Sequence, residues 1–229
     1  MADTIKITID GIETETPAGS TVLDAAKKVG IYIPTLCHMN MDETGMHNRP
    51  ASCRICVVDV EGRKALAPAC ATPVVDGMVV NTKNARVIEA RKTVLELMLS
   101  DHPKDCLSCA KSGDCELQKI ADRLGVREIR VTGKSMSEYP IDSSKAIVRD
   151  MTKCIMCRRC ETMCNQVQSV GTLSAVNRGF DACIGTAFDT PLDESVCVYC
   201  GQCVQVCPVG ALTAKDDVSD KITGLDAGA

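Results

Sequence analysis

The sequence predicts an α+β protein made of several small domains rather than one large one. The chain has 229 residues but no tryptophan, two phenylalanines and three tyrosines, so it has few of the bulky side chains that normally fill a large core. It also has 16 cysteines, which gather in short groups along the chain. We therefore expect several small cores, each organised around something other than apolar side chains.

The N-terminus and the charge balance exclude some classes of protein. The first residues, "MADTIKITIDGIETETP", carry charges where a signal peptide needs an apolar stretch, and no apolar run approaches the roughly 18 residues that span a bilayer. We expect a cytoplasmic protein, because clustered cysteines bind metals in that reducing compartment and disulfides are rare there. The formal net charge of −4 does not favour nucleic-acid binding, which needs a basic surface.

The N-terminal region is expected to form a small α+β domain. Isoleucines alternate with polar residues in "TIKITIDGIETETP", which predicts a hairpin that turns at Asp10 and Gly11. Ser20 or Thr21 can cap a helix over "TVLDAAKKVG" that ends at Gly30. The runs "CVVDV" and "GMVV" predict two later strands. This order of elements is consistent with a β-grasp ferredoxin fold.

Four cysteines accompany this domain. A C-x2-C pair opens the strand-like run "CRICVVDV", one cysteine precedes it, and another follows after a 13-residue gap. Plant-type [2Fe–2S] proteins also combine a near pair with outlying cysteines, although their spacing, C-x4-C-x2-C, is different. The spacing therefore favours a [2Fe–2S] cluster, with zinc as the alternative. The expected ligands are Cys37, Cys53, Cys56 and Cys70.

Near the C-terminus one cysteine spacing occurs twice. "CIMCRRCETMC" and "CVYCGQCVQVC" both follow C-x2-C-x2-C-x3-C, the bacterial ferredoxin spacing, in which the fourth cysteine of each run binds the other [4Fe–4S] cluster. Zinc is the alternative, but it usually takes two separated pairs rather than four thiols in eleven residues. One expected ligand set is Cys154, Cys157, Cys160 and Cys207, and the other is Cys164, Cys197, Cys200 and Cys203.

Between these groups, "HPKDCLSCAKSGDC" offers three cysteines after a histidine. A [4Fe–4S] cluster usually takes four protein ligands. Once the other groups are counted, either His102 or the remaining cysteine, Cys183, supplies the fourth. Histidine replaces cysteine on iron in Rieske centres, and a nearby ligand needs no long loop closure, so spacing favours His102 without excluding Cys183.

Three other features have two interpretations each. "NARVIEARKTVLELML" has helical apolar spacing, and we expect it to form the core of the middle domain, with a partner-docking face as the alternative. Arg158 and Arg159 lie between cluster cysteines, where solvated charge is the first interpretation and an effect on cluster potential or a partner contact is the second. Cys183, if it is not a ligand, is expected to be a small buried apolar residue.

Together the motifs resemble those of a known group of proteins. "IPTLC", "CRICVVDVEG", "DHPKDCLSCAKSGDCELQ" and "CGQCVQVCPVGAL" occur in this order, which resembles three families. They are the large iron–sulfur subunit of respiratory complex I, the N-terminal module of iron-only hydrogenases, and the diaphorase electron-transfer subunit of NAD-reducing nickel–iron hydrogenases. The histidine is a cluster ligand in all three. The resemblance therefore implies a third [4Fe–4S] ligand set, which consists of His102, Cys106, Cys109 and Cys115.

The resemblance also implies a domain order. We expect a β-grasp [2Fe–2S] ferredoxin domain over residues 1–80 and a small helical domain with the histidine-ligated cluster over residues 81–135. A bacterial-type 2[4Fe–4S] ferredoxin domain should occupy residues 136–215. Residues 216–229, "DDVSDKITGLDAGA", are expected to be a disordered polar tail.

The loop between the first two cysteines of the chain departs from the resemblance, because it is a few residues longer than is usual in these families. Its methionines and histidines offer copper ligands, but a loop that covers the cluster or touches a partner is the first interpretation. The residues concerned are His38, Met39, Met41, Met46 and His47.

The short length and the four cysteine groups resemble most the diaphorase electron-transfer subunit of bidirectional hydrogenases, or the short subunit of electron-bifurcating nickel–iron hydrogenases. This resemblance implies a flavin/NAD(P)H-binding diaphorase subunit that carries FMN and NAD(P), a small [2Fe–2S] subunit, and hydrogenase small and large subunits. Soluble ferredoxin is a further partner if electrons are bifurcated. The alternatives are the same electron wire in a formate dehydrogenase complex, a partner of an iron-only hydrogenase, and a free ferredoxin-like carrier.

The sequence contains no G-x-G-x-x-G or P-loop motif and no evident pairing of a nucleophile with a base. We therefore expect the chain to conduct electrons within an oxidoreductase complex and to carry no catalytic site of its own.

Overall fold

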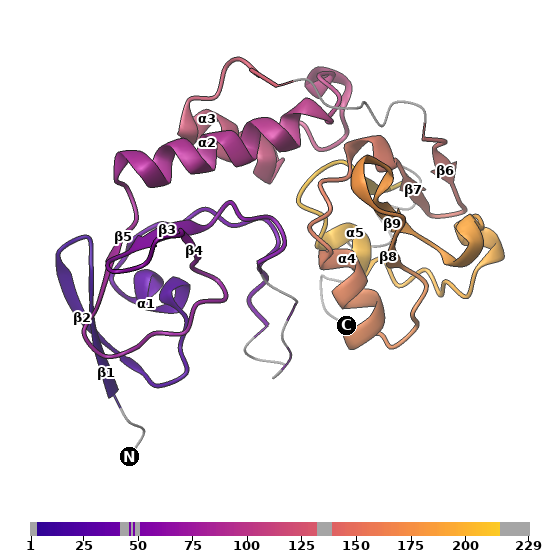
Figure 1. Ribbon diagram of the computed structural model, residues 1–229. Helices are drawn as coiled ribbons and strands as arrows, with labels where there is room; N and C mark the ends of the chain where they lie inside the picture. The colour runs from indigo at the N-terminus through magenta and orange to yellow at the C-terminus, as the bar shows by residue number, and fades with distance from the viewer. Residues whose placement is uncertain (1–3, 42–45, 47, 49–50, 132–138, 216–229) are drawn as a thin grey trace.

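The computed structural model (Figure 1) describes most of the chain, namely residues 4–41, 46, 48, 51–131 and 139–215. The expected polar tail and His47 of the copper alternative lie outside the described residues. Within the described part of the chain, no helix is both long and apolar enough to cross a membrane.

The chain begins with the predicted hairpin. Strand β1 (Thr4–Ile9) pairs antiparallel with β2 (Ile12–Pro17), and the two turn residues, Asp10 and Gly11, have φ values of 50° and 85°. A two-residue hairpin turn needs this left-handed backbone, which explains why an Asp-Gly pair occupies it. The Asp10 carboxylate also accepts hydrogen bonds from the Thr82 amide at 2.7 Å and hydroxyl at 2.6 Å, and so fixes the turn to the chain beyond the sheet.

The hairpin belongs to a five-stranded sheet with the order β2-β1-β5-β3-β4. Strand β5 runs parallel to β1, and β3 runs antiparallel to both β5 and β4. This mixed sheet, with α1 beside it (Figure 1), is the predicted β-grasp arrangement. The remaining strands are β3 (Val57–Val60), β4 (Ala67–Pro68) and β5 (Met78–Asn81).

Helix α1 (Val22–Lys28) starts at Thr21, one of the two predicted caps. The Thr21 hydroxyl accepts a hydrogen bond from the Asp24 amide at 3.2 Å, and the Asp24 carboxylate accepts one from the Thr21 amide at 3.0 Å. This reciprocal capping box satisfies amides that the first helical turn would otherwise leave unpaired. Gly30 follows the helix with a φ of 73°, as its predicted ending requires.

Helix α2 (Ala85–Ser100) confirms the helix predicted from "NARVIEARKTVLELML", but its buried face covers the first domain as well as the middle one. It packs against both β3 and α3 (Glu116–Leu124). The buried Arg91 donates two hydrogen bonds to the carbonyl oxygen of Val57 in β3, at 3.1 Å from Nε and 2.8 Å from Nη2. The second domain is thus joined to the first by a buried polar contact.

The C-terminal part is made of short elements. One sheet has the order β10-β7-β6, and β8 pairs antiparallel with β9. The strands are β6 (Asp142–Ser143), β7 (Ile147–Arg149), β8 (Ser174–Val176), β9 (Cys183–Gly185) and β10 (Leu212–Ala214). The helices are α4 (Arg159–Thr162), its π-helical continuation (Met163–Val167) and α5 (Gln202–Gln205). In the described part of the chain, 3₁₀ turns occur at Cys106–Ser108, Met151–Lys153, Gly179–Asp181, Ala187–Asp189 and Leu192–Glu194.

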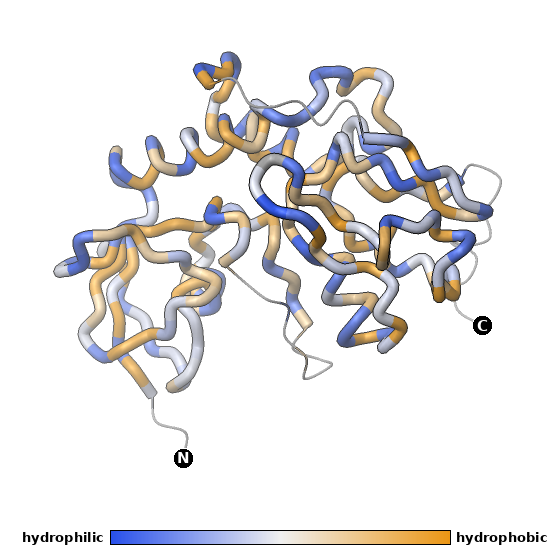
Figure 2. The backbone as a smooth tube through the Cα atoms, turned by 45° about the vertical axis from the view of Figure 1, so that its right-hand side comes forward, coloured by the Kyte–Doolittle hydropathy of each residue, from blue (hydrophilic) through white to orange (hydrophobic). Residues whose placement is uncertain are grey.

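The buried apolar residues form two clusters among the described residues. The first, here called the sheet core, fills the space between α1 and the β-grasp sheet. The second, here called the shared core, takes residues from all three domains, including Leu36, Leu117 and Ile147. Apolar and polar stretches alternate in short segments along the tube in Figure 2.

Arg91→Met should lower the midpoint of anaerobic thermal unfolding by several degrees. The change removes two charge-assisted hydrogen bonds and leaves a buried carbonyl without a partner, which costs about 2 kcal/mol, equivalent to ~4–8 °C in a domain of this size. Arg127→Met is the matched control, because its ion pair with Asp122 is largely exposed and such pairs contribute little. Equal midpoints for the two variants would contradict the expectation.

Candidate metal centres

The four cysteines of the first group come together beside β3 and β4. Cys53 and Cys56 lie just before β3, Cys70 follows β4, and Cys37 lies in the segment after α1; all four are buried. The sulfur atoms of Cys56 and Cys70 are 3.5 Å apart. The amide of Ala51 donates a hydrogen bond to the Cys70 sulfur at 3.2 Å. Backbone donors of this kind stabilise the negative charge that a set of thiolates carries.

Hydrogen bonds among these thiols make two of them acidic. A hydrogen bond from Cys53, followed by one from Cys70, lowers the pKa of Cys37 to about 2. A hydrogen bond from Cys70 lowers the pKa of Cys56 to about 7, and the same contacts raise the pKa of Cys53 and of Cys70. Cysteine binds iron as the thiolate, so a group of mutually contacting, partly acidic thiols fits the deprotonated ligand set of a [2Fe–2S] cluster.

This first group lies between the two cores. Cys37 and Cys53 belong to the shared core, whereas Cys56 and Cys70 belong to the sheet core. The site therefore has one side in the β-grasp domain and the other side toward the rest of the molecule.

The second group lines a cavity of about 590 Å³ in the middle domain. Cys106 comes from a 3₁₀ turn, Cys109 directly follows that turn, and Cys115 caps the N-terminus of α3. The amides of Leu117 and Gln118 lower the pKa of Cys115, but burial raises it by more. His102, two residues beyond α2, also lines this cavity, so the structure brings all four predicted residues to one cavity.

The His102 ring has the properties of a metal ligand. Its Nδ1 atom is buried and has no hydrogen-bond partner among the described residues. Burial lowers the pKa of His102, and the nearby charge of Lys153 lowers it further, although Asp105 and Asp150 act in the opposite direction. The neutral imidazole is thereby favoured, which is the form that binds metals. A buried ring nitrogen without a protein partner is costly, so a metal bond at this ring fits the site.

The two ferredoxin runs line two further cavities in the C-terminal domain. Each run delivers three cysteines to one cavity and its fourth cysteine to the other. This exchange arises because α4 and α5, each of which lies within one of the runs, pack against each other. One cavity is lined by Cys154, Cys157, Cys160 and Cys207, and the other by Cys164, Cys197, Cys200 and Cys203.

The two runs also repeat one backbone conformation. Met156 and Tyr199, at equivalent positions, have φ values of 52° and 54°, and Arg158 and Gly201 have values of 65° and 75°. These left-handed residues turn amides toward the sulfurs; the Met156 amide donates to the Cys154 sulfur at 3.4 Å. Successive inward-facing amides form a concave site that suits an anionic group.

Burial raises the pKa of most of these thiols, to about 11 for Cys154 and about 12 for both Cys157 and Cys203. Buried thiols of this kind become thiolates when a cation compensates the charge, which iron does on binding. Within the described part of the chain, no three His, Cys, Asp or Glu side chains are spaced for a single metal ion. The thiols of these two sets surround cavities instead.

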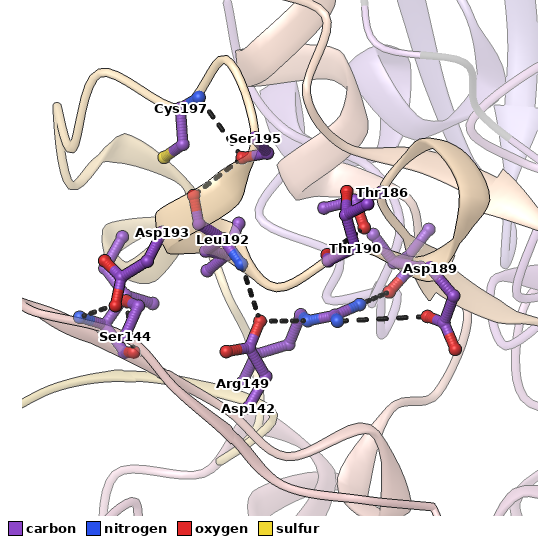
Figure 3. Close-up of polar contacts among 12 residues, drawn as sticks. Asp142, Ser144, Arg149, Thr186, Asp189, Thr190, Leu192, Asp193, Ser195 and Cys197 are labelled. Carbon is purple, nitrogen blue, oxygen red and sulfur yellow. Dashed lines mark hydrogen bonds and ion pairs between the residues drawn. The ribbon is translucent and has the colours of Figure 1, made fainter.

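A network of hydrogen bonds and an ion pair leads from the buried Arg149 to Cys197, which lines one of these two cavities (Figure 3). The buried Arg149 donates to the Asp142 carboxylate at 3.3 Å and to the Ile184 carbonyl at 3.3 Å. The same carboxylate accepts the Leu192 amide at 3.0 Å, and the Ser195 hydroxyl, which donates to the Leu192 carbonyl, accepts the Cys197 amide at 3.2 Å. A buried ion pair therefore orients the loop that carries Cys197, a link that sequence analysis did not identify.

Cys183 lies apart from these ligand sets. It is fully buried in β9, and its sulfur lies 3.0 Å from the Tyr139 hydroxyl. It does not line the cavity of His102. The expectation of a small buried residue is confirmed.

Sequence analysis also missed Gly210. A Cβ atom at this position would lie 2.6 Å from the Cys109 sulfur, well inside any ordinary contact distance. The chain just after the last ferredoxin cysteine therefore packs directly on the cavity of the middle domain, and only glycine leaves room for the thiol.

Three family models match consecutive parts of the chain. They describe a 2Fe-2S iron-sulfur cluster binding domain (residues 2–85), an NADH-ubiquinone oxidoreductase-G iron-sulfur binding region (residues 91–130), and the ferredoxin-like domain of NADH-quinone oxidoreductase subunit 3 (residues 144–213). The predicted order of cluster-binding regions and the α+β fold class are confirmed. The fold and its ligand groups define a protein with several iron–sulfur centres that transfers electrons.

The chain is 59% identical over 221 residues to the NADP-reducing hydrogenase subunit HndD of Solidesulfovibrio fructosivorans, and the alignment covers 96% of this chain and 38% of the relative. It is 42% identical over 212 residues to a subunit of an NADH-quinone oxidoreductase of Rhizobium meliloti, and that alignment covers 91% of this chain and 24% of the relative. The chain thus spans less than two-fifths of either curated relative.

Among solved structures, a chain of the NAD⁺-reducing [NiFe]-hydrogenase in the H₂-reduced state superposes with a TM-score of 0.82 at 31% identity, over 93% of this chain and 88% of that one. This protein belongs to the family of electron-transfer iron–sulfur subunits of NAD(P)-linked hydrogenases, which is related to the iron–sulfur subunits of the complex I-type NADH-quinone oxidoreductases.

Gly210→Ala should remove the cluster of the middle domain selectively. The added methyl group displaces the Cys109 thiol, so iron should fall from about 14 to about 10 atoms per chain, with the remaining three clusters retained. Iron analysis and EPR of the reduced protein measure this. Ser112→Ala, which removes an atom from the lining of the same cavity, is the control and should keep all the iron. Full iron in Gly210→Ala would show that the close approach is not required.

Proposed function

We propose that this chain conducts electrons through one [2Fe–2S] and three [4Fe–4S] clusters, between a flavin- and NAD(P)H-binding subunit and the catalytic metal subunit of a hydrogenase complex. The observation that carries the proposal is the gathering of each predicted ligand set, from separate segments, in one place. Iron–sulfur clusters supply reversible one-electron transfer, and the protein tunes their potentials through ligands, hydrogen bonds and burial.

The proposed ligands are the residues of the four sets. Cys37, Cys53, Cys56 and Cys70 would hold the [2Fe–2S] cluster, and His102, Cys106, Cys109 and Cys115 the histidine-ligated [4Fe–4S] cluster. The other two [4Fe–4S] clusters would be held by Cys154, Cys157, Cys160 and Cys207, and by Cys164, Cys197, Cys200 and Cys203. In support, three of these sets line cavities, and the first set is in mutual contact.

The proposed partners follow from the relatives. One is named as a subunit of an NADP-reducing hydrogenase and another belongs to an NAD⁺-reducing [NiFe]-hydrogenase. By analogy, FMN and NAD(P) would lie on a diaphorase subunit, with a small [2Fe–2S] subunit beside it and hydrogenase small and large subunits at the far end. Electron bifurcation with soluble ferredoxin is a variant of the same proposal. The abundance of clustered cysteines supports a cytoplasmic location.

The exposure of residues around one [4Fe–4S] ligand set supports a proposal for where electrons leave this chain. Cys200 is exposed, in contrast to the buried cysteines of the first ligand set, and exposed Val196 and Val198 flank its neighbour Cys197. We propose that this ferredoxin end faces the catalytic metal subunit, whereas the flavin subunit docks near the histidine-ligated or [2Fe–2S] end.

The test is metal analysis of the complex, purified anaerobically from its host by a tag on this chain. Nickel at about one atom per copy, together with at least about 14 iron atoms per copy, is expected for the nickel–iron hydrogenase assignment, because the partner subunits add iron to that of the four proposed clusters. Molybdenum or tungsten would identify a formate dehydrogenase instead. Iron without any of these metals would assign the chain to an iron-only hydrogenase or to a free carrier, which the co-purifying subunits distinguish.

His102→Cys should lower the midpoint potential of the middle cluster. A thiolate in place of the neutral imidazole makes the cluster more negative, so adding an electron becomes less favourable, by on the order of 100 mV judging from the higher potentials of histidine-ligated centres. A potentiometric EPR titration measures the shift, with Cys183→Ala as a control that should leave the signal in place. An unchanged or higher midpoint in His102→Cys would refute ligation by this histidine.

A further inference from the structure

Arg159 lies where the three domains meet. It opens α4, between Cys157 and Cys160, and is 9% exposed. Its Nη1 and Nη2 atoms donate to the two carboxylate oxygens of Glu116, in the middle domain, at 2.9 and 3.0 Å. Nη2 also donates to the carbonyl oxygen of His38, in the first domain, at 3.1 Å. One side chain therefore holds three domains.

Each of these contacts is next to a predicted ligand in the sequence. His38 follows Cys37 of the [2Fe–2S] set, and Glu116 follows Cys115 of the histidine-ligated set. Arg159 itself lies within the first ferredoxin run. Because a ligand and its neighbour share backbone, a contact at the neighbour limits how far the ligand can move.

Two other contacts join loops that carry ligands of the same three sets. The Glu116 amide donates to the carbonyl oxygen of Pro208 at 2.9 Å, and Pro208 follows Cys207. The Ser52 hydroxyl, just before Cys53, donates to the carbonyl oxygen of Met156, just before Cys157, at 3.1 Å. The shared core contains ligands from the same three sets, namely Cys37, Cys53, Cys115, Cys157, Cys160 and Cys207.

We propose that Arg159 is a positioning residue that fixes the separations among the [2Fe–2S] cluster, the histidine-ligated cluster and the [4Fe–4S] cluster of Cys154, Cys157, Cys160 and Cys207. The inference rests on the proposed electron-transfer function, because it assigns the geometry of that transfer. Electron transfer between centres slows steeply as their separation grows, so a wire made of separate domains needs a rigid junction. A guanidinium suits this task, since its planar fork binds a carboxylate through two parallel hydrogen bonds and retains donors for a carbonyl.

The neighbouring Arg158 shows, by comparison, which contacts belong to Arg159 alone. Both side chains carry the same charge within the same loop, and both make a two-pronged ion pair with a glutamate. The partner of Arg158 is Glu161, three residues along its own loop, and the Arg158 side chain is 31% exposed. Solvated charge, the first interpretation from sequence, holds in part for Arg158 and is wrong for Arg159.

The test compares Arg159→Gln with Arg158→Gln in the cluster-loaded full chain. Each substitution removes one positive charge between the same two cysteines, and a third variant, Arg159→Lys, keeps the charge and so controls for the effect of charge alone on the cluster potential. Only Arg159→Gln removes the contacts between domains. The readouts are iron content, the midpoint potential of each cluster, the magnetic interaction between reduced clusters in EPR, and the rate at which electrons redistribute among them after rapid reduction.

We expect Arg159→Gln to keep its iron but to weaken the magnetic interaction and to slow redistribution several-fold relative to the unchanged chain, because both fall steeply as the separation between clusters grows. Arg158→Gln should leave both unchanged. Arg159→Lys, which keeps the charge without the fork, should be intermediate. Equal magnetic interaction and equal redistribution rates in the two glutamine variants would overturn the proposal.

If Arg159→Gln fails to assemble, Glu116→Gln gives the same test from the other side, because it keeps Arg159 and weakens its acceptor. It should weaken the magnetic interaction in the same direction, and an interaction as strong as in the unchanged chain would overturn the proposal. If the proposed function itself is wrong, iron analysis and EPR will not show four clusters in the unchanged chain. That outcome is distinct from a failure of the proposal for Arg159.

Discussion

The structure depends on one constraint: thiols and an imidazole from distant loops must converge on a few small sites. Only Cys183 among the sixteen cysteines is left outside the predicted ligand sets. Crowding makes some of these thiols acidic, and burial makes others reluctant to ionise, as with Cys37 and Cys157. Because a bound cation offsets the charge of thiolates, we expect metal binding and folding of this chain to be coupled.

The same constraint explains why the domains are not independent. With two phenylalanines and three tyrosines in the whole chain, bulky side chains are scarce, and among the described residues only the β-grasp domain has a core of its own, the sheet core. The shared core therefore collects aliphatic residues and cysteines from all three domains, and α2 packs on β3 as well as on α3. Rigid packing across domain boundaries suits electron transfer, because the distances between redox centres must be reproducible.

Buried arginines complete this packing. Arg91, Arg149 and Arg159 are the arginines that are buried in the described part of the chain, and each donates to a main-chain carbonyl in another segment. Two of these carbonyls belong to strands β3 and β9 and the third belongs to the residue that follows Cys37, and an unpaired buried carbonyl is costly. Arginine, with five donors, satisfies such carbonyls and binds a carboxylate at the same time.

Local sequence was sufficient to predict the β1–β2 hairpin, the Thr21 cap of α1, helix α2 and the cysteine groupings, because turn chemistry, capping and ligand spacing act over a few residues. It was not sufficient for the contact of Arg159 with His38, the close approach of Gly210 to Cys109, or the polar network behind Cys197. These contacts join segments that lie tens to more than a hundred residues apart, and a charged residue between cluster cysteines has the same local pattern whether it faces solvent or a neighbouring domain. Ligand identity is thus encoded locally, whereas the arrangement of the sites was decided by tertiary packing, since only the folded chain brings those loops within hydrogen-bonding distance.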